Sequence, residues 1–288
     1  MKQTFILSLL VAACLTAACS SDSENEEPKT ERHPIIVEVS ENPMKTADAK
    51  QAPSTRAGSQ ITTASFNNFS LSYYYGDSFN TGTYTKNGSG DWTAKNMAWP
   101  YDYNQKLNFY AYNVGTINDG SNPYVSFAVE GNVAAQKDLL VATHPNISYN
   151  DDNGKVSLAF DHACAAVKFT VSKTSSLAEK TIVVTSVLLK NVQKTADYYY
   201  SNGWVINEID KTDYDLTTAA LPEITTTKLD LPCGYLFLIP QSKEDVTLTI
   251  NYTVNGGASL TKNFNLTGTW EAGHEYTINI SMGTSFIS

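Results

Sequence analysis

The sequence predicts an all-β protein with two β-sandwich domains in series, and three observations support this fold class. Short runs of alternating apolar and polar residues, separated by turn-forming residues, recur from residue 61 to residue 280. Abundant threonine, serine and asparagine, together with 17 tyrosines, favour half-buried sheets over long helices. About 270 residues follow the N-terminal apolar segment, a length that suits two domains.

The composition also narrows the class of function. A hydrophobic content of 42% is enough to form real cores. The formal net charge of −9 argues against nucleic-acid binding, because that function requires a basic surface. After residue 19 no segment is long and apolar enough to cross a membrane.

The N-terminus has the pattern of an export signal. Lys2 precedes an apolar segment, residues 5–15, that is too short to span a bilayer, and small residues then lead into Cys19. This pattern resembles a lipoprotein signal peptide, in which cleavage before the cysteine leaves a thiol that receives diacylglycerol. Cys14 follows a similar run and remains an alternative. We predict a signal peptide over residues 1–18 and lipid attachment at Cys19, because the polar, acidic run behind Cys19 suits a solvated tether to the outer membrane.

A single β-branched run follows the tether and stands apart from the later strands. It contains Ile35, Ile36, Val37 and Val39, and Asn42-Pro43 ends it. Residues 44–58 are small and polar, include Arg56 and Ala57, and are typical of an exposed linker that a protease can enter. Residues 19–56 are therefore expected to form a tether that carries one strand.

The first domain is expected over residues 57–173. Residues 66–75 begin its alternating pattern, and Asn87-Gly88-Ser89-Gly90 predicts a hairpin turn between residues 83–85 and 92–94. In the next run, alternation places Leu107, Phe109 and Ala111 on one face. Further strands are expected at residues 124–129, 138–142, 155–160 and 163–171.

The second domain is expected over residues 174–288. The polar run at residues 172–180 marks the boundary to within about ten residues. Turn residues at 202–203 and 255–257 separate some of the strands that follow. These strands are expected at residues 182–189, 198–206, 235–239, 246–254, 260–266 and 275–280.

Residues capable of chemistry are few and scattered. Cys164 and Cys233 are expected to be buried apolar side chains, with a disulfide as the alternative in an oxidising exterior. His162 and Cys164 share a strand face, but no third group is indicated that would orient them as a nucleophile and its base. The cysteine and histidine spacings do not fit zinc. We expect no catalytic residue, no metal and no cofactor.

Two further patterns allow a binding role but favour a structural one. Residues 150–154 resemble part of a calcium loop, although a hairpin turn is the better interpretation because the distal glutamate is missing. The tyrosine trios at residues 73–75 and 198–200 suit a carbohydrate platform, but strand alternation places at least one ring of each trio in a core.

Several segments together resemble one protein family. Trp99-Pro100 is followed by Leu-Asn-Phe-Tyr-Ala-Tyr at 107–112 and by Asp-Leu-Leu-Val-Ala at 138–142. Val-Ser-Leu-Ala-Phe-Asp-His-Ala at 156–163, Leu-Ile-Pro-Gln at 238–241 and Gly-Thr-Trp-Glu-Ala-Gly-His-Glu-Tyr at 268–276 complete the series. In this order and spacing they resemble the fimbrillin-like (Mfa-like) lipoproteins of Bacteroidetes over most of residues 57–282.

The resemblance implies two transthyretin-like β-sandwich domains and a structural or adhesive role in a type V pilus at the cell surface. It also implies that an arginine-specific surface protease cuts between Arg56 and Ala57. The strand with Ile35, Ile36, Val37 and Val39 would then be lost, and a strand from another pilus subunit would replace it.

The position of the subunit in the pilus is predicted from the last residues. Residues 281–288 follow the final expected strand and would extend over roughly 26 Å, enough for one short strand but not for a linker and a long donor strand. We expect a tip or accessory subunit rather than a stalk subunit, with an adhesion target that the sequence does not name. The alternative is a permanently anchored, monomeric surface lipoprotein that binds a glycan or a host protein.

Overall fold

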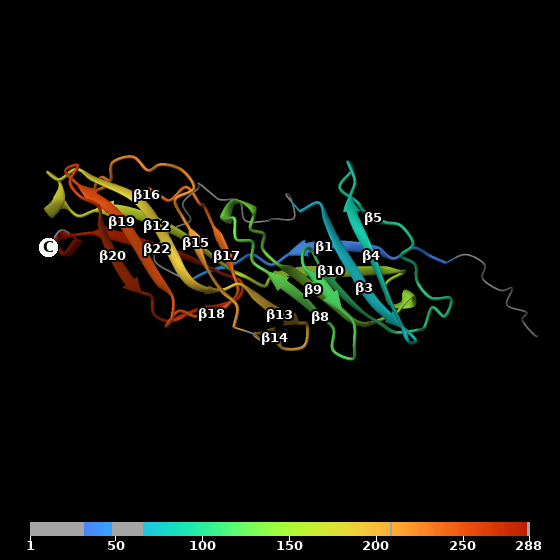
Figure 1. The fold of residues 1–288 in the computed structure, drawn as a ribbon. Helices are drawn as coiled ribbons and strands as arrows, with labels where there is room; N and C mark the ends of the chain where they lie inside the picture. Colours follow the sequence, from blue (N-terminus) through green and yellow to red (C-terminus); the bar gives the residue numbers. More distant parts are fainter. Residues whose placement is uncertain (1–31, 48–65, 208, 287–288) are drawn as a thin grey trace, which may run out of the picture.

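The computed structural model describes residues 32–47, 66–207 and 209–286, which form an elongated all-β molecule with a hydrophobic core in each half (Figure 1). Cys14, Cys19, Arg56 and Ala57 lie outside the described residues. The helical elements of the described residues are 3₁₀ turns of three residues each. None of the described helices has the length and apolar character needed to span a membrane.

The first half is built on a seven-stranded sheet. Its order is β1-β10-β9-β6-β3-β4-β5, and its strands are β1 (Ile36–Glu41), β10 (Lys155–His162), β9 (Leu140–Ile147), β6 (Leu107–Tyr112), β3 (Asn68–Tyr75), β4 (Ser78–Lys86) and β5 (Trp92–Ala94). The predicted alternation in β6 is confirmed, because Leu107, Phe109 and Ala111 are all buried. The predicted hairpin turn is also confirmed, since β4 and β5 pair and the Asn87 side chain accepts hydrogen bonds from the Ser89 and Asp91 amides.

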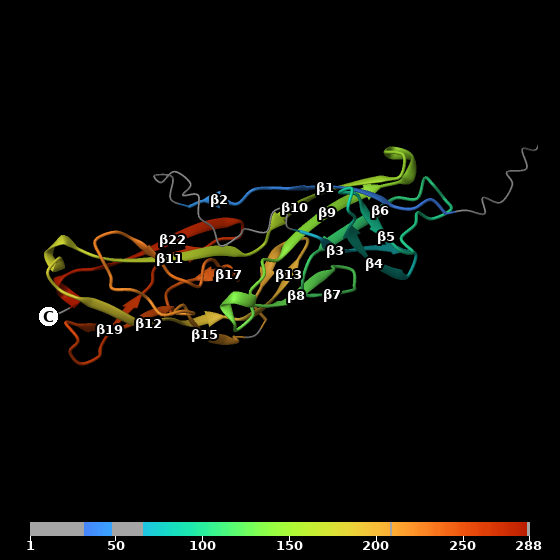
Figure 2. The same cartoon turned by 90° about the horizontal axis from the view of Figure 1, so that it is seen from above.

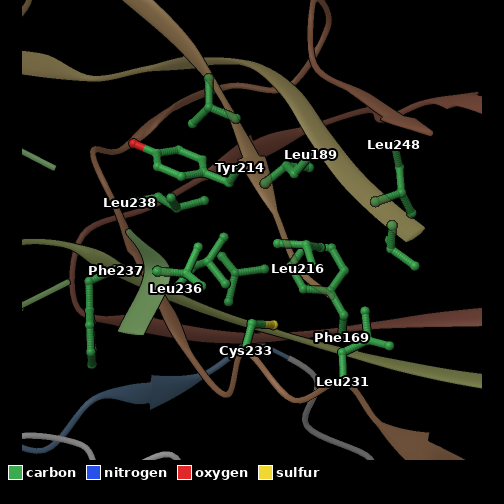
Figure 3. Packing of buried hydrophobic residues seen from close by; sticks show 14 of the residues in the cluster. Phe169, Leu189, Tyr214, Leu216, Leu231, Cys233, Leu236, Phe237, Leu238 and Leu248 are labelled. Atoms are coloured by element: carbon green, nitrogen blue, oxygen red, sulfur yellow. The ribbon is translucent and has the colours of Figure 1, made fainter. Parts of the chain in front are cut away.

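The second half contains two sheets that pack around the larger core. One has the order β16-β11-β22-β2, with β17 also paired to β11, and the other has the order β15-β12-β19-β20. Figure 3 shows Phe169 of β11 and Leu189 and Leu248 of the opposite sheet within this core. The strand bounds are β16 (Leu229–Asp230), β11 (Ala165–Lys173), β22 (His274–Met282), β2 (Lys45–Thr46), β17 (Leu236–Leu238), β15 (Lys211–Asp215), β12 (Ile182–Gln193), β19 (Thr247–Val254) and β20 (Leu260–Asn265).

A smaller sheet joins the halves. Its order is β14-β13-β8-β7, formed by β14 (Gly203–Val205), β13 (Thr195–Tyr199), β8 (Tyr124–Ala128) and β7 (Thr116–Asn118). Val125 and Phe127 of β8 belong to the core of the second half. A two-stranded pair, β18 (Gln241–Ser242) and β21 (Thr269–Trp270), completes the strands.

The strand pairing differs from the expected grouping around the domain boundary. Strand β11, which we expected to close the first domain, pairs with β22, β16 and β17 of the second half. Phe160 is the last residue along the chain that belongs to the first core, but Val125, Phe127 and Leu139, which precede it, already belong to the second core. The reason is that β10 and β11 follow each other almost without a turn, whereas the polar run after Lys173 leads into η3 (Ser175–Leu177) at the far end of β11. The expected division of the chain into domains stays a prediction.

Cys164 and Cys233 are both buried and free, as the sequence favoured. Burial raises the pKa of the Cys164 thiol well above its usual value and that of Cys233 to about 12. Both side chains therefore act as small buried groups and not as thiolate nucleophiles.

Candidate functional site

The N-terminal segment, residues 32–47, crosses both halves of the molecule (Figure 2). Its first strand, β1, pairs in parallel with β10, and its second strand, β2, pairs in parallel with β22. Residues 48–67 connect it along the chain to β3. The segment thus belongs to two sheets at once while lying at one end of the sequence.

Strand β1 lies along β10, and residues 33–35, which lead into it, lie beside residues 97–99; we call the surface that residues 33–41 cover the β1 groove. On one side the register runs from Ile36 opposite Lys155 to Glu41 opposite Phe160. On the other side the Ile35 amide donates to the Met97 carbonyl (3.0 Å), and the Trp99 amide donates to the His33 carbonyl (2.9 Å). Strand β1 therefore closes the first half rather than lying on its outside.

Alternate side chains of residues 35–39, which comprise Ile35 and the first part of β1, enter the core of the first half. Ile35 is 4% exposed and Val37 is 6% exposed, and Val39 packs against the same core. Ile36, between them, is 48% exposed. Of the four residues predicted for this strand, three face the core and Ile36 faces solvent, as the period of a strand requires.

Glu41 continues the inward-facing series and meets His162 at the end of the groove. In β10, Val156, Leu158 and Phe160 form a buried stripe, and His162 occupies the next inward position. The His162 Nε2 atom lies 3.0 Å from Glu41 Oε1, and its Nδ1 atom contacts the Asp138 carboxylate. The side chains of His162 and Asp138 are 1% and 0% exposed, while that of Glu41 is 13% exposed.

The geometry of this trio sets the charge of His162. A neutral imidazole donates from one nitrogen only, whereas both nitrogens of His162 face carboxylate oxygens, so the imidazolium is the form that fits. Burial lowers the pKa of His162, but the hydrogen bonds and charges of Asp138 and Glu41 outweigh it, and the pKa is raised overall. Burial also raises the pKa of Asp138, against the lowering effect of His162.

This trio supplies the orienting group that the sequence did not indicate, yet it does not form a catalytic site. Asp138 holds His162 and accepts a hydrogen bond from the Cys164 amide at 3.3 Å. The Cys164 side chain is fully buried, and burial raises its pKa well above the usual value, so neither a thiolate nor access for a substrate is provided. No local sequence signal links the three residues, because Glu41 and His162 are 121 positions apart and Asp138 and His162 are 24 apart.

The exposed side of β1 carries a second ion pair of a different kind. Glu38 Oε1 lies 2.7 Å from Lys155 Nζ, with the two side chains 56% and 46% exposed. Solvent screens such a pair, so it contributes little. Only the inward contact of Glu41 is shielded from water.

Strand β2 docks on the second half by main-chain contacts. The Lys45 amide donates to the Gly273 carbonyl (2.8 Å), and the Ala47 amide donates to the Glu275 carbonyl (3.0 Å). Met44 packs against the core of the second half. The segment therefore covers an edge of β22 as well as the groove beside β10.

The end of the described chain folds back on its own half. After β22, the turn η4 (Thr284–Phe286) buries Phe286 against the rings of Tyr252 and Phe264, with centroid distances of 5.7 and 5.3 Å. The Tyr252 hydroxyl donates to the Phe286 carbonyl, and Lys262 Nζ donates to the Ser285 carbonyl at 3.0 Å.

The other sequence candidates have structural roles in the described residues. Residues 150–154 lie in the connection between β9 and β10, where the Asp151 carboxylate accepts from the Ser148 amide and pairs with Lys106. Those contacts, the Lys106 hydrogen bond first, lower the pKa of Asp151 to about 2. Tyr73 is buried, whereas Tyr75 is 40% exposed. Within the described part of the chain, no cluster of histidine, cysteine, aspartate and glutamate suits a metal ion.

A family model described as fimbrillin-like matches residues 46–287. The chain belongs to the fimbrillin-like family. Solved structures of similar fold include a fimbrial protein of Bacteroides vulgatus, with a TM-score of 0.56 and 18% identity over 86% of this chain and 95% of that one. A Bacteroides uniformis protein, provisionally named as a cell adhesion protein, gives 0.54 and 19% over 76% of this chain and 88% of that one. A search among curated proteins finds no match.

The resemblance and the all-β sandwich fold expected from the sequence are therefore confirmed. As a fimbrillin-like protein, the chain is a subunit of a fimbrium at the cell surface. Membership of this family makes it a structural protein rather than an enzyme.

Proposed function

We propose that this fimbrillin-like protein is exported as a lipoprotein, held at the outer membrane through Cys19, and assembled by strand exchange after cleavage between Arg56 and Ala57. The observation that supports this proposal is the N-terminal segment itself. It supplies a strand to each half, yet residues 48–67 alone join it to β3. One cut in that connection would free both strands from the rest of the chain.

Loss of the segment would leave two kinds of unsatisfied surface. The main-chain groups of β10 and β22 that now pair with β1 and β2 would lose their partners. The pockets that hold Ile35 and Val37 would also open to water. A strand from another subunit restores both the main-chain bonds and the apolar contacts, which is the energetic basis of strand addition. Until cleavage, the segment protects these edges from premature pairing.

The distribution of arginine fits a single processing enzyme. The sequence contains two arginines, Arg32 and Arg56, and none follows Arg56. They flank the part of the segment that carries both strands. An arginine-specific protease would therefore cut the segment out without cutting either sandwich.

We propose a tip or accessory position in the pilus. Residues 283–286, which follow β22, pack into their own half through Phe286, so they are not held ready as a donor strand. A subunit that accepts a strand but does not donate one terminates a chain of subunits.

The alternative is a permanently anchored monomer that binds a glycan or a host protein. A cleft of about 350 Å³ favours it, because aromatic and neutral polar side chains line the cleft and suit an uncharged sugar. The lining residues are Asn108, Phe109, Tyr110, Ser121, Asn122, Pro123, Thr143, Pro145, Tyr200 and Ser201. Loss of glycan-array binding in a Tyr110→Ala variant would support this function.

Treatment of the soluble chain from residue 20 with an arginine-specific protease tests strand exchange. We expect the cut protein to form higher-order species with partner subunits in size-exclusion chromatography and electron microscopy, and an Arg56→Lys variant to remain monomeric. If the cut protein stays monomeric with every co-expressed fimbrial subunit, the permanently anchored monomer is favoured.

A further inference from the structure

The end of the β1 groove is a charged site enclosed by protein. His162 holds Asp138 through Nδ1, and with β1 in place its side chain is only 1% exposed. Its Nε2 atom donates a hydrogen bond to the Glu41 carboxylate on β1. When β1 leaves, Asp138 stays with His162, but the Nε2 donor loses its acceptor.

A replacement strand must then supply a hydrogen-bond acceptor for the Nε2 atom of His162. A strand with an apolar residue at the position of Glu41 would cover an imidazolium without giving it a hydrogen bond, which is costly in a buried site. A carboxylate at that position restores a charge-assisted hydrogen bond, which is stronger than a neutral one. We propose that the β1 groove is a binding site selective for strands that carry a carboxylate opposite His162. This inference rests on the proposed function, in which β1 is removed.

Strand β1 shows the full pattern that the groove accepts. Together with the preceding Ile35, its inward side presents Val37 and Val39 at alternate positions and then Glu41. The ligand is therefore a parallel strand in which three alternating apolar residues are followed, two positions later, by aspartate or glutamate. The outward residue Glu38 contributes little to selection, because its ion pair with Lys155 is solvent-exposed.

The same pattern indicates which partner fits. Within this chain, Ile278, Ile280 and Met282 of β22 have the same apolar spacing, but Thr284 stands where the carboxylate is required. A second copy of this chain is therefore a poor donor through that segment. The groove selects a different subunit whose donor strand carries an acid at this register.

Peptide competition on the wild-type protein tests the selectivity. Protein from residue 20 is cut after Arg32 and Arg56, and a fluorescent peptide of residues 33–56 is exchanged into the groove. Unlabelled competitors are the same peptide, its Glu41→Gln form and its Glu38→Gln form. We expect the Glu41→Gln peptide to bind about tenfold more weakly and the Glu38→Gln peptide to bind within about twofold of the native one.

The outcomes separate the two levels of the proposal. If all three peptides compete equally, the carboxylate selectivity is overturned and strand exchange stands. If no peptide enters the cut protein, both strand exchange and the selectivity are overturned. A His162→Gln protein gives a second check, because the difference between the native and Glu41→Gln peptides should disappear there.

Discussion

Glu41, the last residue of β1, lies 3.0 Å from the Nε2 atom of His162, which follows it by 121 positions in the chain. The contact joins the N-terminal segment to the buried Asp138 through one imidazole. At this contact the β1 groove, which is otherwise lined by apolar side chains, contains charged groups.

Glu41 should stabilise the folded chain more than Glu38, although both are acids on β1. We expect Glu41→Gln to lower the free energy of unfolding by about 1–1.5 kcal/mol, because a shielded, charge-assisted hydrogen bond becomes a neutral one. Glu38→Gln should leave it unchanged, since its partner Lys155 is well exposed. Urea titration of the uncut chain measures both. Equal effects of the two substitutions would contradict a special role for His162.

Ile35 and Ile36 form a matched pair of the same residue type. Ile35 is 4% exposed in the core and Ile36 is 48% exposed on the outer face. We expect Ile35→Ala to destabilise the fold by about 2–4 kcal/mol and Ile36→Ala by less than about 1 kcal/mol. The same urea titration compares them. A larger loss for Ile36→Ala would mean that β1 presents its other face to the core.

Docking of β1 should weaken as the pH rises. The pKa of His162 is raised in the fold, despite burial, by Asp138 and Glu41. Because the folded pKa is raised, protonated His162 stabilises the fold fully below its ordinary pKa of about 6.5. This stabilisation is lost as the pH rises through the higher pKa of the folded protein.

The release of peptide 33–56 from the cut protein measures this effect. We expect faster release at about pH 9 than at about pH 6 for the wild-type protein, and little change for His162→Gln. Release that slows with rising pH would show that His162 is neutral when β1 is docked.

Cys164 and Cys233 should stay reduced and unreactive. Both are free and buried, and burial raises the pKa of each thiol. In protein that starts at residue 20, a thiol reagent should label neither cysteine under native conditions and both after unfolding. Mass spectrometry without reductant provides the check. A mass lower by two hydrogens would indicate a disulfide and a different arrangement of the second core.

The sequence predicts local features of this fold well. The alternation of Leu107, Phe109 and Ala111 gives a strand and its buried face, and the turn chemistry of Asn87 gives the β4–β5 hairpin. Each depends on neighbours within a few positions. The strand expected at residues 35–39 was found by the same kind of pattern, and in the structure β1 runs from Ile36 to Glu41.

Local sequence patterns do not show which strands pair when they are far apart in the chain. Strand β11 alternates equally well whether it ends the first sandwich or pairs with β22, so its residues alone do not choose. The contact of His162 with Asp138 and Glu41 is also set by three separate strands or loops meeting in space. The sequence indicated no orienting group for His162, because both of its partners are remote along the chain.

The N-terminus of the protein in assembled fimbriae tests the central claim most directly. Fimbriae are sheared from cells and purified, and the first residue of this subunit is identified by N-terminal sequencing and mass spectrometry. Removal of the segment that carries β1 and β2 requires a chain that begins at Ala57. A chain that begins at a lipid-modified Cys19 in every fimbrial preparation would contradict strand exchange and indicate a permanently anchored protein.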